Sequence, residues 1–352
     1  MPRSKRPRSP LNPPPNPLKL EGDGVLHAPD QQALLDWYDT HQRDLPWRRT
    51  QDPWHILLSE VLLQQTQVSR GKVYWERMVQ RFPTVESMAK APVDAVLKAW
   101  EGAGYYSRAR RLHALSQQVM LSSQEGGFDG ALPSTYEALL SLPGIGPYTA
   151  AAVASIAFEQ PVACVDGNIR RVMARMTAQN EPTVHEVQAW ADDSLVSERA
   201  GDWNQALMEL GATVCTPKRV KCGVCPLRTG CLGSDHPEAY PLPKRQRVKE
   251  VVLTAWVEWA QDGRPVLTQR PMDGLFAGLW GPAYHEGVRP PDTDHVHCGV
   301  VKHTLSHRKM TVHVLVSTTR TVESGVIAEE VALSTLDEKV LSLAKACIDA
   351  DA

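Results

Sequence analysis

The sequence predicts two domains of different fold class, an all-α domain followed by an α+β domain. From about residue 30 to residue 231, apolar residues recur three and four positions apart, which is the period of amphipathic helices. After residue 250 the apolar period changes to two, which indicates strands. Residues 233–248 are polar and rich in proline, as interdomain linkers are, so we expect domains at 26–232 and 249–352.

The first 25 residues predict a disordered basic arm. They contain seven of the 27 prolines, and residues 1–20 carry five Lys or Arg residues and no acid. No apolar run approaches the roughly 20 residues of a membrane span, and no apolar region of a secretory signal follows the basic start. We therefore expect a cytoplasmic protein without membrane contact.

The average charge argues against a nucleic-acid partner, because the net charge is −2 and the pI is about 6.6. Basic clusters nevertheless recur at 108–111, 218–221 and 244–249. A single cluster of this kind is usually a solvated face. Three clusters beside structured motifs favour a polyanionic partner.

The helical domain reads as many short helices separated by glycine and proline. Helical periodicity is clearest over residues 33–38, 56–68, 95–100 and 186–195. In the C-terminal domain, residues 251–259 and 265–269 flank an Asp-Gly turn and predict a β-hairpin. Another strand is expected at 310–317, and an amphipathic helix at 336–348 closes the chain.

Four of the seven cysteines fall within one short segment, 215–231. Six, two and five residues separate Cys215, Cys222, Cys225 and Cys231, and this spacing lets four thiolates converge on one metal centre. From the spacing, zinc and an iron–sulfur cluster are equally good interpretations. An odd cysteine total without an export signal argues against a disulfide framework.

The loop after the first of these cysteines carries three cations, Lys218, Arg219 and Lys221. A metal centre would hold such a loop rigidly, and phosphate contacts need cations held in place. The loop therefore suggests a DNA-facing, structural role for the metal.

The segment Leu142–Ala150, LPGIGPYTA, predicts a tight turn that leads into an Ala-rich helix. A turn with Gly144 and Gly146 leaves backbone N–H groups unpaired at the helix start, where they can bind a phosphate together with the helix dipole. Such turns also occur for packing reasons alone.

Two carboxylates are candidate catalytic groups. Glu60 has apolar neighbours on both sides within a predicted helix, and a carboxyl group in an apolar pocket has a raised pKa and acts as a general acid near neutral pH. Asp166 precedes Gly167 and Asn168, and the commoner interpretation of Asp-Gly-Asn is a helix N-cap.

Taken together, these residues resemble the helix-hairpin-helix DNA glycosylase superfamily with an iron–sulfur cluster, and within it the adenine DNA glycosylase (MutY) family. The resemblance covers residues 30–232 closely and the C-terminal domain more loosely. It implies a helix-hairpin-helix glycosylase domain with one 4Fe–4S cluster on the loop 215–231. The matching stretches are Leu45–Arg48, Ser59–Thr66, Gly102–Arg108, Leu142–Ala150, Val165–Asn168 and the four cysteines.

The resemblance implies removal of adenine that is mispaired with 8-oxoguanine or guanine in double-stranded DNA, after the base is flipped out of the duplex. Glu60 matches the general acid that protonates adenine, and Asp166 matches the carboxylate that stabilises the oxocarbenium-like sugar. Asn168 matches a helper of that carboxylate, and Tyr148 matches a residue near the sugar and the acid. The implied product is an abasic site in a base-excision repair pathway.

Further residues gain roles from the same resemblance. Trp47 and Arg48 correspond to the lining of the adenine pocket. Gln65 and Tyr105 correspond to side chains that insert into the DNA stack. Without the resemblance, core packing would be the preferred interpretation of Tyr105.

The C-terminal domain resembles a Nudix-like 8-oxoguanine recognition domain. Ser306 and His307 would then lie at the 8-oxoguanine, although Leu305 stands where the family pattern has phenylalanine. A second departure is Ala103, where leucine is expected. The Nudix hydrolase signature is missing from the sequence, which argues against nucleotide hydrolysis by this domain.

Two other functions compete with this interpretation. An endonuclease III-like glycosylase/lyase needs an amine for a Schiff base, but Tyr148 stands where its lysine would be. A non-catalytic DNA-binding protein with the same cluster is expected to lose Glu60 or Asp166, and both are present. We therefore expect a monomeric, monofunctional glycosylase, associated with the nucleoid if the protein is bacterial.

Overall fold

The computed structural model describes residues 24–243, 248–305 and 307–351. It divides into two compact units, each built from two stretches of chain. The first unit contains residues up to 60 together with 132–243, and the second contains 61–131 together with the described residues from 248 onward. Most of the expected arm, residues 1–23, lies outside the described residues, as do residues 244–247 of the expected linker and of the third basic cluster. Within the described residues, no helix is long and apolar enough to cross a membrane.

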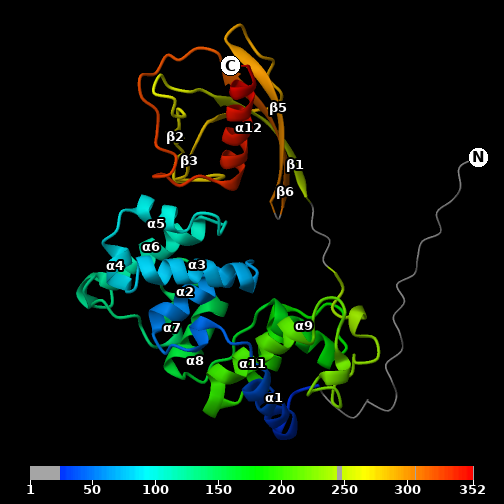
Figure 1. Cartoon of the computed structure of the whole chain (residues 1–352). Helices are drawn as coiled ribbons and strands as arrows, with labels where there is room; N and C mark the ends of the chain where they lie inside the picture. Colours follow the sequence, from blue (N-terminus) through cyan, green and yellow to red (C-terminus); the bar gives the residue numbers. More distant parts are fainter. Residues whose placement is uncertain (1–23, 244–247, 306, 352) are drawn as a thin grey trace, which may run out of the picture. The chain divides into compact units, whose positions relative to one another are not determined.

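The first unit is helical, as the sequence predicts (Figure 1). Its α-helices are α1 (Ala28–His41), α2 (Pro53–Leu63, whose last turn belongs to the second unit), α7 (Tyr136–Leu140), α8 (Pro147–Phe158), α9 (Gly167–Met176), α10 (Val184–Asp193) and α11 (Ala200–Thr213). Its 3-10 turns are η2 (Pro46–Arg48), η4 (Ser197–Arg199), η5 (Cys222–Val224) and η6 (Pro237–Ala239).

The core of this unit forms where α11 packs on α8 and α9. Small residues allow a close approach, because the Ala-rich α8 is buried over most of its length. A Cβ atom at Gly201 of α11 would stand 2.7 Å from the backbone oxygen of Ser155 on α8. The sequence of α8 therefore sets how closely the helices that carry the candidate site approach each other.

The first half of the predicted linker is attached to this helical unit. The amide of Gly233 donates to the carbonyl of Arg175 at 2.8 Å, and the amide of Leu242 donates to the carbonyl of Asn180 at 2.8 Å. The side chain of Arg175 also donates to the carbonyls of Pro237 and Tyr240. Composition alone did not reveal these contacts, because they are made by the backbone amides and carbonyl oxygens of the segment and not by its side chains.

The second unit combines helices with a sheet. Its helices are α3 (Val68–Arg81), α4 (Val85–Ala89), α5 (Val93–Ala99), α6 (Ser107–Met120), η3 (Ser123–Glu125) and α12 (Thr335–Asp351). Its strands are β1 (Lys249–Val257), β2 (Thr268–Gln269), β3 (Trp280–Gly281), β4 (Ala283–Glu286), β5 (His295–Leu305) and β6 (Arg308–Ser317). The expected helix over 56–68 ends at Leu63, so that part of the prediction is wrong.

The strands form a mixed sheet in the order β4-β1-β6-β5, and α12 packs on one face of it (Figure 1). Strand β1 pairs in parallel with β6 and antiparallel with β4. The expected hairpin is confirmed only next to its turn, where Trp259 forms an antiparallel bridge with Pro265 and the amide of Val266 donates to the carbonyl of Glu258 at 2.9 Å. Strand β1 itself pairs with β4 and β6, so the expected pairing along its length is wrong. The α+β class, the strand at 310–317 and the closing helix are confirmed.

One disulfide joins β5 to α12, between Cys298 and Cys347, whose Cα atoms are 5.6 Å apart. The sequence interpretation did not anticipate this pair, because the two cysteines are 49 residues apart and carry no motif. Antiparallel packing of the closing helix on the edge strand brings them together. Within the described residues, the four clustered cysteines and Cys164 take no part in a disulfide.

Candidate active site

Glu60 is a buried carboxyl group inside an apolar helix. It lies on α2 between Leu58 and Val61, which are buried like it, and 7% of its surface is exposed. The phenol of Tyr148 on α8 donates a hydrogen bond of 2.5 Å to its Oε2 atom. The burial expected from the neighbouring residues is therefore observed, and Tyr148 supplies a hydroxyl donor at this acid.

Burial raises the pKa of Glu60 from 4.5 to about 7. The hydrogen bond from Tyr148 lowers the pKa, because it favours the ionised carboxylate, and the nearby charge of Asp166 raises it. Close to neutral pH this group is therefore half protonated. A carboxylic acid with that pKa can both deliver a proton and take it back.

Asp166 is the N-cap of α9, and the structure shows how that role shapes its chemistry. Its Oδ1 atom accepts hydrogen bonds from the amides of Asn168 at 2.8 Å and Ile169 at 2.7 Å. Its Oδ2 atom accepts a third bond, from the side-chain amide of Asn168 at 2.7 Å. Burial raises the pKa of Asp166 and these three donors lower it, but burial is the larger effect, so the net shift is upward.

Asn168 connects this carboxylate to the cysteine loop. Its Oδ1 atom accepts a hydrogen bond of 2.8 Å from Arg171, whose Nε donates to the carbonyl of Cys215 at 2.8 Å. Arg171 also donates to the carbonyl of Gly211 at 2.7 Å. A Cβ atom at Gly211 would meet the Asn168 Cβ at 2.5 Å, so a larger residue there would displace Asn168. Packing and hydrogen bonds together fix Asn168.

Tyr148 lies in the first turn of α8, directly after the glycine-rich turn. Gly144 adopts φ +79°, a left-handed conformation that favours glycine, and Gly146 is the N-cap residue of α8. No side chain caps this N-terminus within the described residues. The turn thus leaves a helix N-terminus available for an anion, and burial raises the pKa of Tyr148 so far that it stays a neutral phenol.

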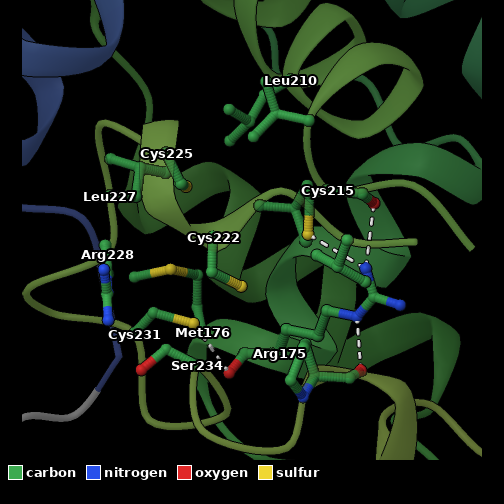
Figure 2. A pocket seen from close by; sticks show the side chains of 14 residues that line it. Arg175, Met176, Leu210, Cys215, Cys222, Cys225, Leu227, Arg228, Cys231 and Ser234 are labelled. Carbon is green, nitrogen blue, oxygen red and sulfur yellow. Dashed lines mark hydrogen bonds between the residues drawn. The ribbon is translucent and has the colours of Figure 1, made fainter. Parts of the chain in front are cut away.

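The four predicted metal ligands, Cys215, Cys222, Cys225 and Cys231, line one pocket (Figure 2). Across the described part of the chain, no three His, Cys, Asp or Glu side chains already have the arrangement that a single metal ion needs. Arg175, 2% exposed, donates to the Cys215 carbonyl at 3.0 Å and approaches its Sγ at 3.3 Å (Figure 2). The pocket therefore offers four sulfurs and one buried cation.

The cationic loop next to this pocket is exposed as predicted. Lys218, Arg219 and Lys221 all face solvent, and the hydroxyl of Thr216 donates to the carbonyl of Lys218 at 2.7 Å. Arg219 adopts φ +55°, which turns the loop sharply between the first two cysteines. The loop presents three solvated cations on a short, hydrogen-bonded turn.

In the second unit, Gln65 and Tyr105 are exposed and lie at loop positions. Both have left-handed backbones, with φ of +58° and +47°. His307 is exposed in the turn between β5 and β6, and Ser306 lies outside the described residues. Gln65, Tyr105 and His307 line the same pocket of this unit, together with the half-buried Leu305.

Comparison with known proteins decides the family. Residues 58–194 match the HhH-GPD superfamily of base excision DNA repair proteins. An adenine DNA glycosylase from Rattus norvegicus is 35% identical over 382 aligned residues, which cover 86% of this chain and 73% of the rat protein. The chain belongs to the adenine DNA glycosylase family.

Other members and neighbours of the adenine DNA glycosylase family agree with this assignment. The Homo sapiens adenine DNA glycosylase is 42% identical over 237 residues, which cover 63% of this chain and 40% of the human protein. A solved thermostable thymine-DNA glycosylase superposes with a TM-score of 0.53 at 29% identity, over 58% of this chain and 94% of that one. The helical domain thus has the fold of base-excision DNA glycosylases.

The sequence did not reveal Glu209, a buried carboxylate that binds the predicted site residue Arg48. Glu209 of α11 is 1% exposed and accepts a hydrogen bond of 2.8 Å from Arg48. Arg43 binds both oxygens of the same carboxylate, at 2.6 and 2.8 Å. Trp47 is 7% exposed, and the buried Nε of Arg48 has no hydrogen-bond partner in the described structure. One signal could have revealed Glu209: its position on the apolar face of α11.

The two arginines keep Glu209 ionised. Burial raises the pKa of Glu209, but the hydrogen bonds and charges of Arg43 and Arg48 lower it by more, so the net shift of the pKa is downward. Arg48 in turn is oriented by the Glu209 carboxylate and by the carbonyl of Arg43 at 3.0 Å. This network fixes the guanidinium of Arg48.

Proposed function

We propose that the protein removes adenine mispaired with 8-oxoguanine or guanine from double-stranded DNA, by hydrolysis of the N-glycosidic bond. The observation that carries the proposal is the pair of buried carboxyl groups with opposite environments. Glu60 has one phenol donor and a pKa of about 7, whereas Asp166 accepts three N–H donors. Environments of this kind separate an acid from a stabilising carboxylate.

In this mechanism Glu60 donates its proton to the flipped adenine, which makes the base a better leaving group. Tyr148 donates to Oε2 of the same carboxyl group and so stabilises the carboxylate that remains. The ionised Asp166 then stabilises the positive charge that develops on the sugar, and Asn168 keeps its Oδ2 in place. Water completes the reaction and leaves an abasic site.

The absence of an amine favours hydrolysis over strand cleavage. A lyase forms a Schiff base through a lysine in the turn that precedes α8. Here Tyr148 stands at that position, and its phenol is neutral and bound to Glu60. The arrangement supports a monofunctional enzyme, and the two retained carboxylates support catalysis rather than passive DNA binding.

We also propose that the cysteine pocket holds one 4Fe–4S cluster. The four cysteines line one pocket, as the ligands of a zinc ion or of an iron–sulfur cluster would, and the resemblance to glycosylases with such a cluster favours the second. When bound, the cluster would fix the loop that carries Lys218, Arg219 and Lys221. These cations and the Gly144–Gly146 turn are the expected phosphate contacts.

The C-terminal sheet is proposed to be a Nudix-like domain that recognises 8-oxoguanine, with His307 and Ser306 at the lesion. Its support is the mixed sheet with α12 on one face, and the pocket that His307 shares with Gln65 and Tyr105. We also propose that the protein acts as a monomer and is associated with the chromosomal DNA. Leu305 packs at the edge of the domain core, so it fills the place of the expected phenylalanine with a smaller side chain.

Release of free adenine from a duplex with adenine opposite 8-oxoguanine tests the proposal directly. Glu60→Gln should abolish release, and Glu76→Gln on α3 is a matched control that should behave like the unmodified chain. Unchanged adenine release by Glu60→Gln would refute the assignment of the acid. Efficient borohydride trapping of a protein–DNA adduct would instead establish the lyase.

A further inference from the structure

Arg108 is a buried arginine whose hydrogen bonds, within the described residues, all go to backbone carbonyl groups. It lies near the start of α6 and is 9% exposed. Its Nη1 donates to the carbonyls of Val61 at 2.6 Å, Leu62 at 3.2 Å and Gln64 at 2.7 Å. The last carbonyls of a helix have no intrahelical partner, so this cation caps the C-terminus of α2.

The other terminal nitrogen of Arg108 binds a second loop. Its Nη2 donates to the carbonyls of Ala103 at 3.4 Å and Gly104 at 3.3 Å. The guanidinium carbon lies 5.3 Å from the ring centroid of Tyr105 and 5.4 Å from that of Trp100. The Trp100 indole also donates to the Gly104 carbonyl, at 2.9 Å. One planar group therefore connects the loop after α2 with the loop before α6.

Each of these loops presents one exposed side chain from an unfavourable backbone conformation. Gln65 follows the bound carbonyl of Gln64 and has φ +58°, and Tyr105 follows the bound carbonyl of Gly104 and has φ +47°. A left-handed backbone is unfavourable for a residue other than glycine, and it persists where the surroundings hold it. Arg108 contacts the residue before each of them.

The chemistry of arginine suits this task. Burial lowers the pKa of Arg108 to about 10, so the side chain stays charged at neutral pH. Its planar fork can donate to two loops at once, whereas the ammonium of lysine is a point donor. No carboxylate pairs with Arg108 in the described part of the chain, so its charge is directed only at carbonyl dipoles and ring faces.

We propose that Arg108 is a positioning residue that holds Gln65 and Tyr105 together in the geometry with which they meet DNA. The inference rests on the proposed function, since it takes these two side chains as the DNA-inserting groups. A single side chain thus sets both insertions, and loss of its fork weakens recognition of the mispair before it affects the chemical step.

Arg108→Lys in the full-length protein tests the inference, with Arg108→Gln as a neutral second variant that keeps a donor. Arg77→Lys is the matched control, because Arg77 also donates through Nη1 to two carbonyls, of Ala99 and Glu101, but at an exposed site. Binding is measured by fluorescence anisotropy on a duplex with adenine opposite 8-oxoguanine and on the same duplex with adenine opposite thymine. Amide hydrogen exchange is followed over residues 64–67 and 103–106.

We expect Arg108→Lys to lose about tenfold of the preference for the mispaired duplex, and to exchange faster in both loops. The saturating single-turnover rate should fall much less, and Arg77→Lys should match the unmodified chain. Equal loss of affinity for both duplexes, or faster exchange in only one loop, would overturn the inference. If the unmodified chain prefers the mispair but releases no adenine, the proposed function fails while Arg108 is still tested.

Discussion

Replacing Tyr148 with phenylalanine should move the alkaline limb of adenine release to higher pH. The phenol donates to Glu60 at 2.5 Å and favours the ionised carboxylate, so its loss raises the pKa of Glu60 above the present value of about 7. The active form of a general acid is the protonated one. The variant should therefore keep its acid protonated at pH values where the unmodified enzyme has lost it.

The size of the shift follows from the hydrogen bond that is removed. A hydrogen bond to a charged group contributes about 1.5–3 kcal/mol, and 1.36 kcal/mol corresponds to one pH unit. We therefore expect the limb to move upward by about one to two pH units. The charge of Asp166, which also raises the pKa of Glu60, is unaffected by the substitution.

Single-turnover adenine release, measured across the pH range, is the appropriate assay because it isolates the chemical step. The maximal rate of Tyr148→Phe should also fall, but the position of the limb is the decisive quantity. Tyr136→Phe removes a phenol hydroxyl from the neighbouring helix α7 and serves as the control. A limb that stays in place, or one that moves to lower pH, would refute the assignment of Glu60 as the acid that Tyr148 modulates.

Three further predictions concern stability. The pKa of Glu60 is about 7 in the folded chain, above its ordinary 4.5. The contribution of its protonated form to folding stability is therefore complete below about pH 4.5 and is lost as pH rises through 7. At pH 8, Glu60→Gln should raise the free energy of unfolding in urea by up to about 3 kcal/mol. Replacing Cys298 and Cys347 by serine should cost about 2–4 kcal/mol, given their 49-residue separation, and thiol reduction of the unmodified chain should have the same effect. Arg43→Ala should lower the free energy of unfolding by about 1–2 kcal/mol, a modest loss because Arg43 is 37% exposed and its ion pair is partly screened by solvent. The same change should slow adenine release, because Glu209 is then held less firmly. Thermal unfolding and turnover measure the two effects.

Local sequence was sufficient where one segment determines its own environment. The apolar neighbours of Glu60 predicted its burial, and the structure shows 7% exposure. Residues 310–317 and 336–348 have clear periods, and a strand and a helix lie there. These features could be predicted because a residue's neighbours in the chain are also its neighbours in space.

Features that depend on distant partners could not be predicted in this way. Helical periodicity continues past Leu63, but Arg108 on a separate helix caps α2 at that point. Strand β1 pairs with β6, which is remote in sequence, so the nearby segment 265–269 meets the predicted strand only next to the turn. The position of Glu209 on the apolar face of α11 is a signal of burial, but its partners Arg43 and Arg48 lie 166 and 161 residues away in sequence.

Asp166 shows that a helix cap and a catalytic group can be the same feature. The amides of Asn168 and Ile169, which bind the carboxylate, are the unpaired donors at the start of α9. Capping the helix therefore supplies the N–H donors that favour the ionised carboxylate against the effect of burial. An alanine at this position would remove the helix cap and the anion together. The structural and the proposed catalytic interpretation of Asp-Gly-Asn are thus one arrangement, and the dipole of α9 opposes protonation of the group that we propose stays negative beside the sugar.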